Sequence, residues 1–125
     1  MTEEWEWEVG GAGPVSLRAA LAELRARAAD GGFEAWLTSG SGRQLAVVSN
    51  AERAMVMLLE GPGDPGEHAL DPGAEGWSEG FVLSNGQLDE YPDEDTVPIG
   101  RALEIVEHIL TTGRPPADTP WSVDR

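Results

Sequence analysis

The sequence predicts an α+β fold in a single domain spanning residues 1–125, with a mainly antiparallel sheet packed against two amphipathic helices. Segments 16–29 and 98–112 carry apolar residues at helical spacing, and several short β-prone runs lie between them. Three of these runs follow one another without an intervening helix, which favours antiparallel pairing. A length of 125 residues and a hydrophobic content of 40% suit one globular domain.

The N-terminal quarter predicts one strand followed by one helix. Residues 5–9 alternate apolar and acidic side chains, the pattern of a strand with one buried face. The Gly-rich stretch 10–13 breaks this pattern. Ser16 is the expected N-cap of a helix that runs to about Ala29, and Gly31 is its expected stop.

The middle of the chain predicts three short strands at residues 33–38, 44–50 and 54–60. A Ser/Gly turn at 39–42 separates the first two strands. The stretch 61–76 is rich in Pro, Gly and acidic residues, so we expect a long loop there, or a loop that contains a short strand.

A hairpin is predicted around Asn85-Gly86, which lies between Phe81-Val82-Leu83 and Leu88. Asn-Gly between two strand-like runs favours a type I′ turn, because that turn needs positive φ at both central residues. Five carboxylates follow directly, within the seven residues 89–95 around Tyr91. We therefore expect an acidic tip at the protein surface.

The C-terminal part predicts the second helix and a last short strand. Pro98 suits the first turn of a helix, and a broad apolar stripe continues up to Gly113, the expected stop. The pair Pro115-Pro116 prevents continuation, and residues 121–123 are predicted to return as a strand.

Charge and composition exclude several function classes. There are 23 acidic and 8 basic residues, which give a formal net charge of −15. Such a field repels nucleic acid and attracts a basic partner, although it also serves solubility alone. Cysteine is absent, which excludes disulfides, thiolate nucleophiles and Cys-ligated zinc.

Candidate catalytic and metal-binding residues are few. The sequence has two histidines, His68 and His108, and no lysine. Glu104 and His108 lie one helical turn apart, but two ligands do not make a metal site. The acidic stretches 64–71 and 93–95 do not follow the calcium-loop pattern. We predict no enzyme activity, no cofactor and no metal; a metal-binding or enzymatic protein using these groups is the less favoured reading.

The N-terminus lacks the basic and apolar regions of a signal peptide, and no apolar run reaches the length of a membrane span. We therefore expect a cytoplasmic protein with no membrane partner.

A protein-binding surface is the remaining interpretation of the acidic segment. Of the five tryptophans, Trp77 alone lies where no apolar periodicity provides for its burial. An aromatic side chain beside carboxylates is typical of a binding hot spot. The alternative is that Trp77 folds back to cover the sheet. The predicted partner-binding residues are Trp77, Asp89, Glu90, Tyr91, Asp93, Glu94 and Asp95.

Residues 33–125 resemble the Imm immunity-protein family numbered one. The resemblance rests on the run 51–60 with its following loop, Gly80-Phe81-Val82-Leu83 before Asn85-Gly86, Asp89-Glu90-Tyr91-Pro92, Val97-Pro98, and Gly113-Arg114-Pro115-Pro116 with Trp121. It implies an α+β, non-enzymatic inhibitor of a toxin from a bacterial polymorphic toxin system, often a nucleic-acid deaminase.

Charge is compatible with that implication. A toxin acting on nucleic acid needs a basic groove, and a small acidic protein suits such a groove as a polyanion mimic. The predicted partner is therefore a cognate basic toxin domain. The alternative is a small acidic adaptor or regulatory module that binds an unrelated protein.

Overall fold

Helices and mostly antiparallel strands make up the chain, which confirms the predicted α+β class. The computed structural model describes residues 4–9, 14–83 and 85–124. The break predicted at residues 10–13 lies outside them. The elements are β1 (Trp5–Val9), β2 (Pro14–Val15), α1 (Leu17–Asp30), β3 (Phe33–Ser39), β4 (Gln44–Ser49), β5 (Arg53–Leu59), β6 (Glu67–Ala69), β7 (Trp77–Val82), β8 (Leu88–Pro92), the 3-10 helix η1 (Asp93–Asp95), β9 (Val97–Pro98), α2 (Ile99–Thr112) and β10 (Trp121–Val123).

The first helix begins and ends as predicted. The Ser16 hydroxyl accepts a hydrogen bond from the backbone N–H of Ala19 at 3.2 Å, so Ser16 is the N-cap. Gly31, with a φ of 139°, ends the helix. The buried side of α1 is formed by Ala20, Leu21 and Leu24.

The second helix carries the wider apolar stripe. It follows Pro98 directly and ends at Gly113, whose φ of 79° lies in the left-handed region that glycine adopts without strain. The Gly113 N–H donates to the carbonyl of Ile109 at 2.7 Å. The buried positions of this helix are Ala102, Ile105, Val106, Ile109 and Leu110.

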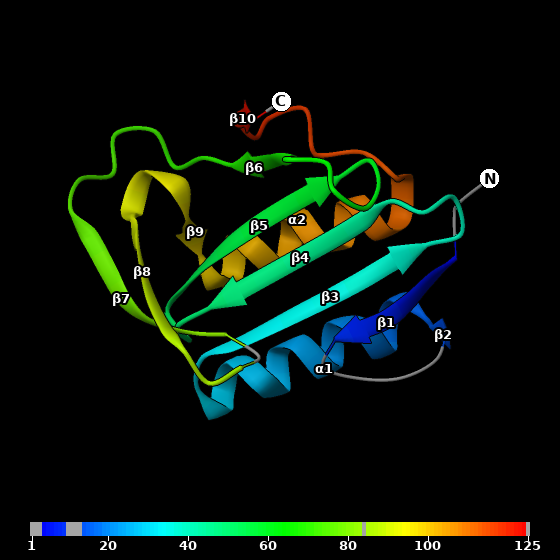
Figure 1. Ribbon diagram of the computed structural model, residues 1–125, viewed down its shortest axis with the longest axis horizontal. Coiled ribbons are helices and arrows are strands. Elements are labelled where there is room, and N and C mark those ends of the chain that lie inside the picture. The colour runs from blue at the N-terminus through cyan, green and yellow to red at the C-terminus, as the bar shows by residue number, and fades with distance from the viewer. Residues whose placement is uncertain (1–3, 10–13, 84, 125) are drawn as a thin grey trace.

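Strands β3, β4 and β5 form the centre of the main sheet, in the antiparallel arrangement predicted from their sequence order. The full order is β10-β6-β5-β4-β3-β1-β2, and β9 also pairs with β5 (Figure 1). The short strand β6 within residues 61–76 and the last strand β10 pair with each other. Of the two alternatives for residues 61–76, the structure has the loop that contains a short strand, and the C-terminal strand is confirmed.

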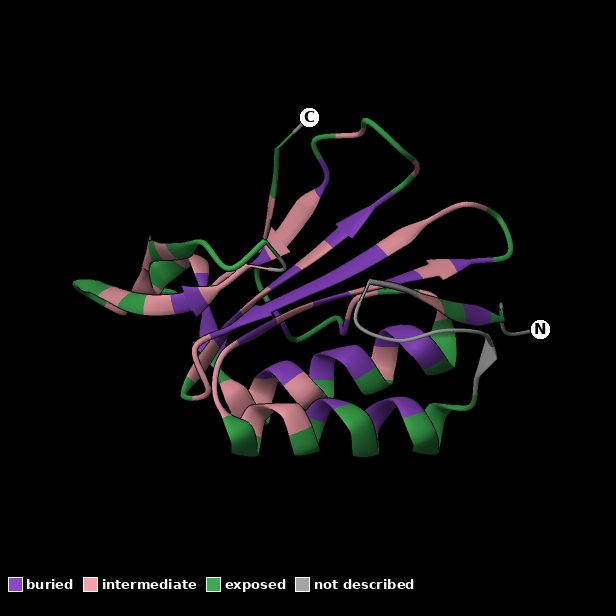
Figure 2. Ribbon diagram, turned by 60° about the horizontal axis from the view of Figure 1, so that its bottom comes forward, coloured by how far each residue is buried: buried purple, intermediate pink, exposed green. Residues whose placement is uncertain are grey.

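Both helices lie on the same face of the main sheet (Figure 2). Leu37, Leu45 and Leu58 are aligned across the three central strands and belong to the core that includes the helices. The next aligned row, Trp36, Ala46 and Met57, belongs to the opposite face of the sheet because side chains alternate along a strand. Trp36 and Met57 are half-buried there, on a face that neither helix covers.

Strands β7 and β8 form a separate two-stranded sheet, called the ribbon below (residues 77–92). The ribbon crosses one end of the main sheet, near the start of β3 and the end of β4 (Figure 1). Gly32 lies at this crossing: a Cβ at this position would meet the Ser49 carbonyl oxygen at 2.7 Å, Val82 Cγ2 at 2.9 Å and the Gly80 carbonyl oxygen at 3.0 Å. Only a residue without a side chain permits this approach.

We predict that Gly32→Ala lowers the free energy of unfolding by about 1–3 kcal/mol, because two of the three neighbours are backbone atoms that move only with their strands. Gly40→Ala is the matched control, since a Cβ at Gly40 meets nothing within 4 Å. Urea unfolding of both variants measures the difference. Equal midpoints would show that the ribbon does not press on Gly32.

Candidate protein-binding surface

The ribbon carries most of the predicted site. Trp77 pairs with Pro92 and Ser78 with Tyr91, and after an irregularity Phe81 pairs with Asp89 and Val82 with Leu88. Gly80 lies in that irregularity with a φ of 85°, a backbone conformation that glycine adopts without strain. The irregularity lets the strand bend where it meets the main sheet.

The predicted hairpin exists, but its turn is not of type I′. A type I′ turn needs positive φ at both Asn85 and Gly86, and only Gly86 has it, with a φ of 87°. The N–H of Gly86 donates to the Leu83 carbonyl, and the Asn85 Oδ1 accepts from the N–H of Gln87. Asn85 therefore acts through its side chain, and the loop has glycine at its last position, as three-residue hairpin loops require.

One face of the ribbon is turned toward the protein. Phe81 is fully buried, and Tyr91 packs edge-on against it with ring centroids 4.8 Å apart. The Tyr91 hydroxyl donates to Asp89 at 3.0 Å. Burial, followed by the hydrogen bond and the negative charge of Asp89, raises the pKa of Tyr91 to about 12. Tyr91 therefore stays neutral and supports the ribbon from within.

The other face of the ribbon carries two large apolar side chains in water. Trp77 is 66% exposed and Leu88 is 67% exposed. The exposure expected for Trp77 is thus found. Leu88 was not among the predicted site residues. Its position beside the turn and directly before two carboxylates is the sequence feature that could have indicated its exposure. Trp77 pairs with Pro92 and Leu88 with Val82, so the two lie toward opposite ends of the ribbon and act as separate apolar anchors beside carboxylates.

An open hollow of about 520 Å³ lies beside Leu88. It is lined by Glu79, Gly80, Leu88, Asp89 and Glu90. Two of these acidic residues, Asp89 and Glu90, were predicted from the sequence, whereas Glu79 was missed because it lies in β7, on the other side of the turn from the acidic run. The lining combines carboxylates with one apolar wall, which suits a long basic side chain.

The acidic segment does not form the hairpin tip, contrary to our expectation. Asp89, Glu90 and Tyr91 lie along β8, and residues 93–95 form η1 at the end of the ribbon opposite the turn. The Asp93 carboxylate accepts a hydrogen bond from the Ser78 hydroxyl, and Asp95 accepts from His68. Glu94 is the member of this group whose side chain is exposed. Alternate acidic residues thus hold the fold, and the others face solvent.

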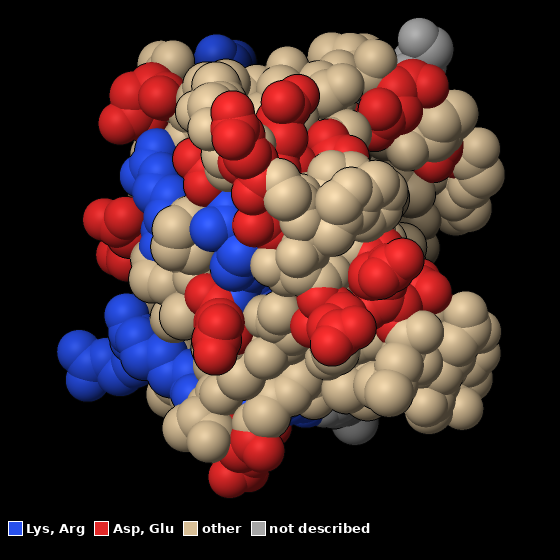
Figure 3. Space-filling model, turned by 90° about the vertical axis from the view of Figure 1, so that its left-hand side faces the viewer, with Lys and Arg blue, Asp and Glu red and all other residues tan. Residues whose placement is uncertain are grey.

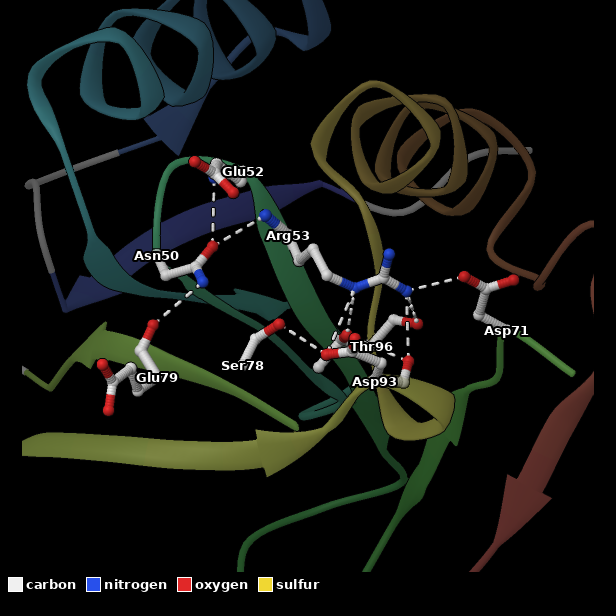
Figure 4. A network of polar contacts seen from close by, with 8 residues as sticks. All are labelled: Asn50, Glu52, Arg53, Asp71, Ser78, Glu79, Asp93 and Thr96. Carbon is white, nitrogen blue, oxygen red and sulfur yellow. Dashed lines mark hydrogen bonds and ion pairs between the residues drawn. The ribbon is translucent and has the colours of Figure 1, made fainter. Parts of the chain in front are cut away.

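Arg53 ties the acidic segment to the main sheet (Figure 4). Its guanidinium donates to the Asp71 carboxylate at 2.6 Å, to the Thr96 hydroxyl at 2.8 Å, and to the carbonyls of Thr96 and Asp93 at 3.0 and 3.1 Å. The Arg53 side chain is 19% exposed. One side chain of β5 therefore fixes the chain both before and after the ribbon.

Asn50 makes a second tie, at the turn between β4 and β5. Its Nδ2 donates to the Glu79 carbonyl at 3.0 Å, while its Oδ1 accepts from the N–H groups of Glu52 and Arg53 (Figure 4). Ala51, within the same turn, has a φ of 80°, the left-handed region that non-glycine residues seldom adopt. Asn50 thus holds a tight turn and the strand β7 at once.

His68 forms a third tie between distant segments. Its Nε2 lies 3.0 Å from Asp95 of η1, and its Nδ1 lies 2.8 Å from Asp124 after β10. Burial by itself lowers the pKa of His68, but the hydrogen bonds and charges of Asp124 and Asp95 outweigh that effect and leave the pKa above its ordinary value. Protonated His68 therefore bridges two carboxylates.

Carboxylates dominate the side of the molecule that carries the ribbon. Figure 3 shows Asp and Glu side chains spread over this side, with the arginines mainly toward one margin. Glu79, Glu90 and Glu94 are exposed, and their carboxylates make no ion pair within the described part of the chain. This leaves negative charge available around Trp77 and Leu88.

The weaker candidate sites are occupied by structural contacts. Glu104 lies 3.6 Å from the guanidinium of Arg101, and His108 Nδ1 is 2.8 Å from the Arg114 carbonyl. The Asp64 carboxylate accepts from the backbone N–H of Glu60. Across residues 4–9, 14–83 and 85–124, no group of three or more His, Asp or Glu side chains is arranged to hold a metal ion.

We predict that Arg53→Met lowers the free energy of unfolding by about 2–4 kcal/mol, because it leaves a partly buried set of oxygens without their donor. Arg53→Lys should recover only part of the loss, since lysine lacks the planar fork. Arg18→Met, at an exposed position of α1, is the control and should change stability by less than about 0.5 kcal/mol. Urea unfolding gives all three values. If Arg53→Met matched the control, the network would contribute nothing to stability.

The bridge at His68 predicts a pH dependence of stability. A pKa raised on folding means that the folded state binds the proton more tightly, so this contribution is complete below about pH 6.5 and is lost as pH rises through the raised pKa. The difference in unfolding free energy between the wild type and His68→Gln should therefore shrink from pH 5.5 to pH 8.5. A difference that grows with pH would contradict the assignment.

No protein-family model matches this chain, and no curated protein matches it. Neither helix within the described residues combines the length and apolar content needed to cross a membrane.

Proposed function

We propose that this chain is a non-enzymatic immunity protein that binds a cognate bacterial toxin through the outer face of the ribbon and so neutralises it. The observation that carries the proposal is the pair of exposed apolar side chains, Trp77 and Leu88, on a ribbon that Arg53 and Asn50 tie to the main sheet and that exposed carboxylates border. The resemblance to the Imm immunity-protein family numbered one supplies the class of partner.

Rigid display makes this surface suitable for tight binding. Interfaces gain most of their free energy from a few aromatic anchors that become fully desolvated. The anchors contribute more when their backbone is already ordered, because less conformational entropy is lost on association. Arg53 fixes the chain just before and just after the ribbon, and Asn50 holds the middle of β7, before any partner arrives.

Charge supports a nucleic-acid-acting toxin as the partner, and a deaminase in particular. An enzyme that modifies bases holds the phosphate backbone in a basic groove. A protein with a net charge of −15 and exposed carboxylates at Glu79, Glu90 and Glu94 complements such a groove. A toxin of this kind acts on nucleic acid inside the cell, so the proposed site of action of the inhibitor is the cytoplasm.

The charge hypothesis is tested by neutralising the three exposed carboxylates together, as Glu79→Gln, Glu90→Gln and Glu94→Gln. Asp93 and Asp95 are left unchanged, because their carboxylates accept hydrogen bonds from Ser78 and His68 that hold the fold. We expect association with the toxin encoded by the adjoining gene to slow about tenfold at low salt, and the salt dependence of the association rate to flatten. Stopped-flow kinetics at several salt concentrations measures both.

The matched control removes the same number of charges away from the ribbon, as Glu4→Gln, Glu6→Gln and Glu107→Gln, all at exposed positions. Trp77→Ala tests the anchor and should speed dissociation about tenfold or more. Equal association rates for the two triple variants would place the interface elsewhere. A wild-type protein that does not bind this toxin, but binds a non-toxin partner, would favour the adaptor function.

A further inference from the structure

We propose that the free edge of β8 receives an extended segment of the partner as a third strand of the ribbon. The inference rests on the proposed function and adds to it the mode of binding: main-chain pairing at one edge, with an alternating basic and apolar segment of the toxin as the occupant. Strand addition of this kind takes its affinity from backbone hydrogen bonds and its specificity from alternate side chains.

The ladder between β7 and β8 determines which backbone groups point outward. The Leu83 N–H donates to the Gln87 carbonyl at 2.9 Å at one end, and the Asp93 N–H donates to the Gly76 carbonyl at 3.0 Å at the other. In an antiparallel pair, successive residues direct their backbone groups alternately toward and away from the partner strand. Counting from either end, Asp89 and Tyr91 face β7, whereas Leu88 and Glu90 face away from it.

These outward groups have no partner among the residues that the structure describes. The sheet that contains β8 has two strands, and no backbone hydrogen bond outside the ladders involves Leu88 or Glu90 among the described residues. The edge of β7 that faces away from β8 is already bonded to the main sheet, because the Glu79 carbonyl accepts a hydrogen bond from Asn50 (Figure 4). Figure 4 shows β7 between the Asn50 turn and β8, so β8 is the outer strand.

Side chains along this edge define the occupant. Glu79, Asp89 and Glu90 border the hollow next to Leu88. An added strand would place an arginine or lysine beside Glu90, which neutralises the carboxylate, and an apolar residue against Leu88, which removes its side chain from water. Pro92 has no N–H to donate, so an added strand can pair with only a short stretch of β8 that ends at Pro92.

A second copy of this chain is a poor occupant of the same edge. Each copy carries a net charge of −15, and pairing the edges brings Asp89 and Glu90 of both copies together. Like charges on neighbouring strands destabilise the pair. Charged residues and proline at an open edge are also how proteins prevent self-pairing, which leaves the edge free for a basic partner.

Amide hydrogen exchange by NMR tests the edge directly. In the free protein, the amides of Leu88 and Glu90 should exchange rapidly, because they face solvent. In the complex with the toxin encoded by the adjoining gene, both should exchange at least about tenfold more slowly, while the amide of Asp89, already paired with β7, should change less.

Two substitutions at one position separate backbone pairing from charge. Glu90→Pro removes the outward N–H and leaves the ladder with β7 intact, whereas Glu90→Gln removes only the charge. We expect Glu90→Pro to speed dissociation of the complex about tenfold beyond Glu90→Gln. Thermal unfolding of both free variants checks that the ribbon remains folded, and the exchange experiment needs no variant at all.

The outcomes distinguish this inference from the proposed function. A complex that forms with unchanged exchange at Leu88 and Glu90 overturns edge pairing and leaves the proposed function standing. A toxin that does not bind at all overturns both. Protection of the two amides that rises with the concentration of this protein alone makes a second copy the occupant and overturns the pairing with the toxin.

Discussion

The guanidinium of Arg53 is the constraint on which the rest of the structure depends. It binds oxygens of Asp71, Asp93 and Thr96, which lie 18 to 43 residues away along the chain. Because the fork is planar and always charged, it fixes all these groups in one arrangement. The ribbon begins and ends between them, and α2 starts immediately afterwards. The Asp71 N–H also donates directly to the Glu94 carbonyl at 2.9 Å, and Arg53 attaches this joined pair of segments to β5 of the main sheet.

This anchoring explains why an exposed ribbon can serve recognition. A two-stranded hairpin is only marginally stable on its own in water. Here, the Phe81 side chain of the ribbon is buried, Gly32 lets the ribbon approach the main sheet, and Asn50 binds the edge of β7 that faces away from β8. The protein therefore presents Trp77 and Leu88 on a backbone that is already ordered, and binding loses less entropy as a result.

The acidic residues divide into two kinds that the sequence does not distinguish. Asp71, Asp93 and Asp95 accept hydrogen bonds from Arg53, Ser78 and His68, so their charge stabilises the fold. Glu79, Glu90 and Glu94 are exposed, so their charge acts on whatever approaches. This division matters for interpreting mutations, because neutralising the first kind changes stability and neutralising the second changes association.

The sequence by itself determined the elements whose causes are local. Ser16 caps α1 through a contact three residues away, Gly113 ends α2 through its own φ, and Asn85-Gly86 closes the hairpin within five residues. The presence of the hairpin turn was predicted correctly, but its type was not. Asn85 can either adopt a left-handed backbone or accept a hydrogen bond with its side chain, and the sequence does not decide between them. Only the tertiary structure decided which carboxylates are paired, that Tyr91 packs against Phe81, and that Leu88 and the edge of β8 stay open. These outcomes depend on which distant strands meet, and every Asp offers the same local chemistry until a partner such as Arg53 is brought to it.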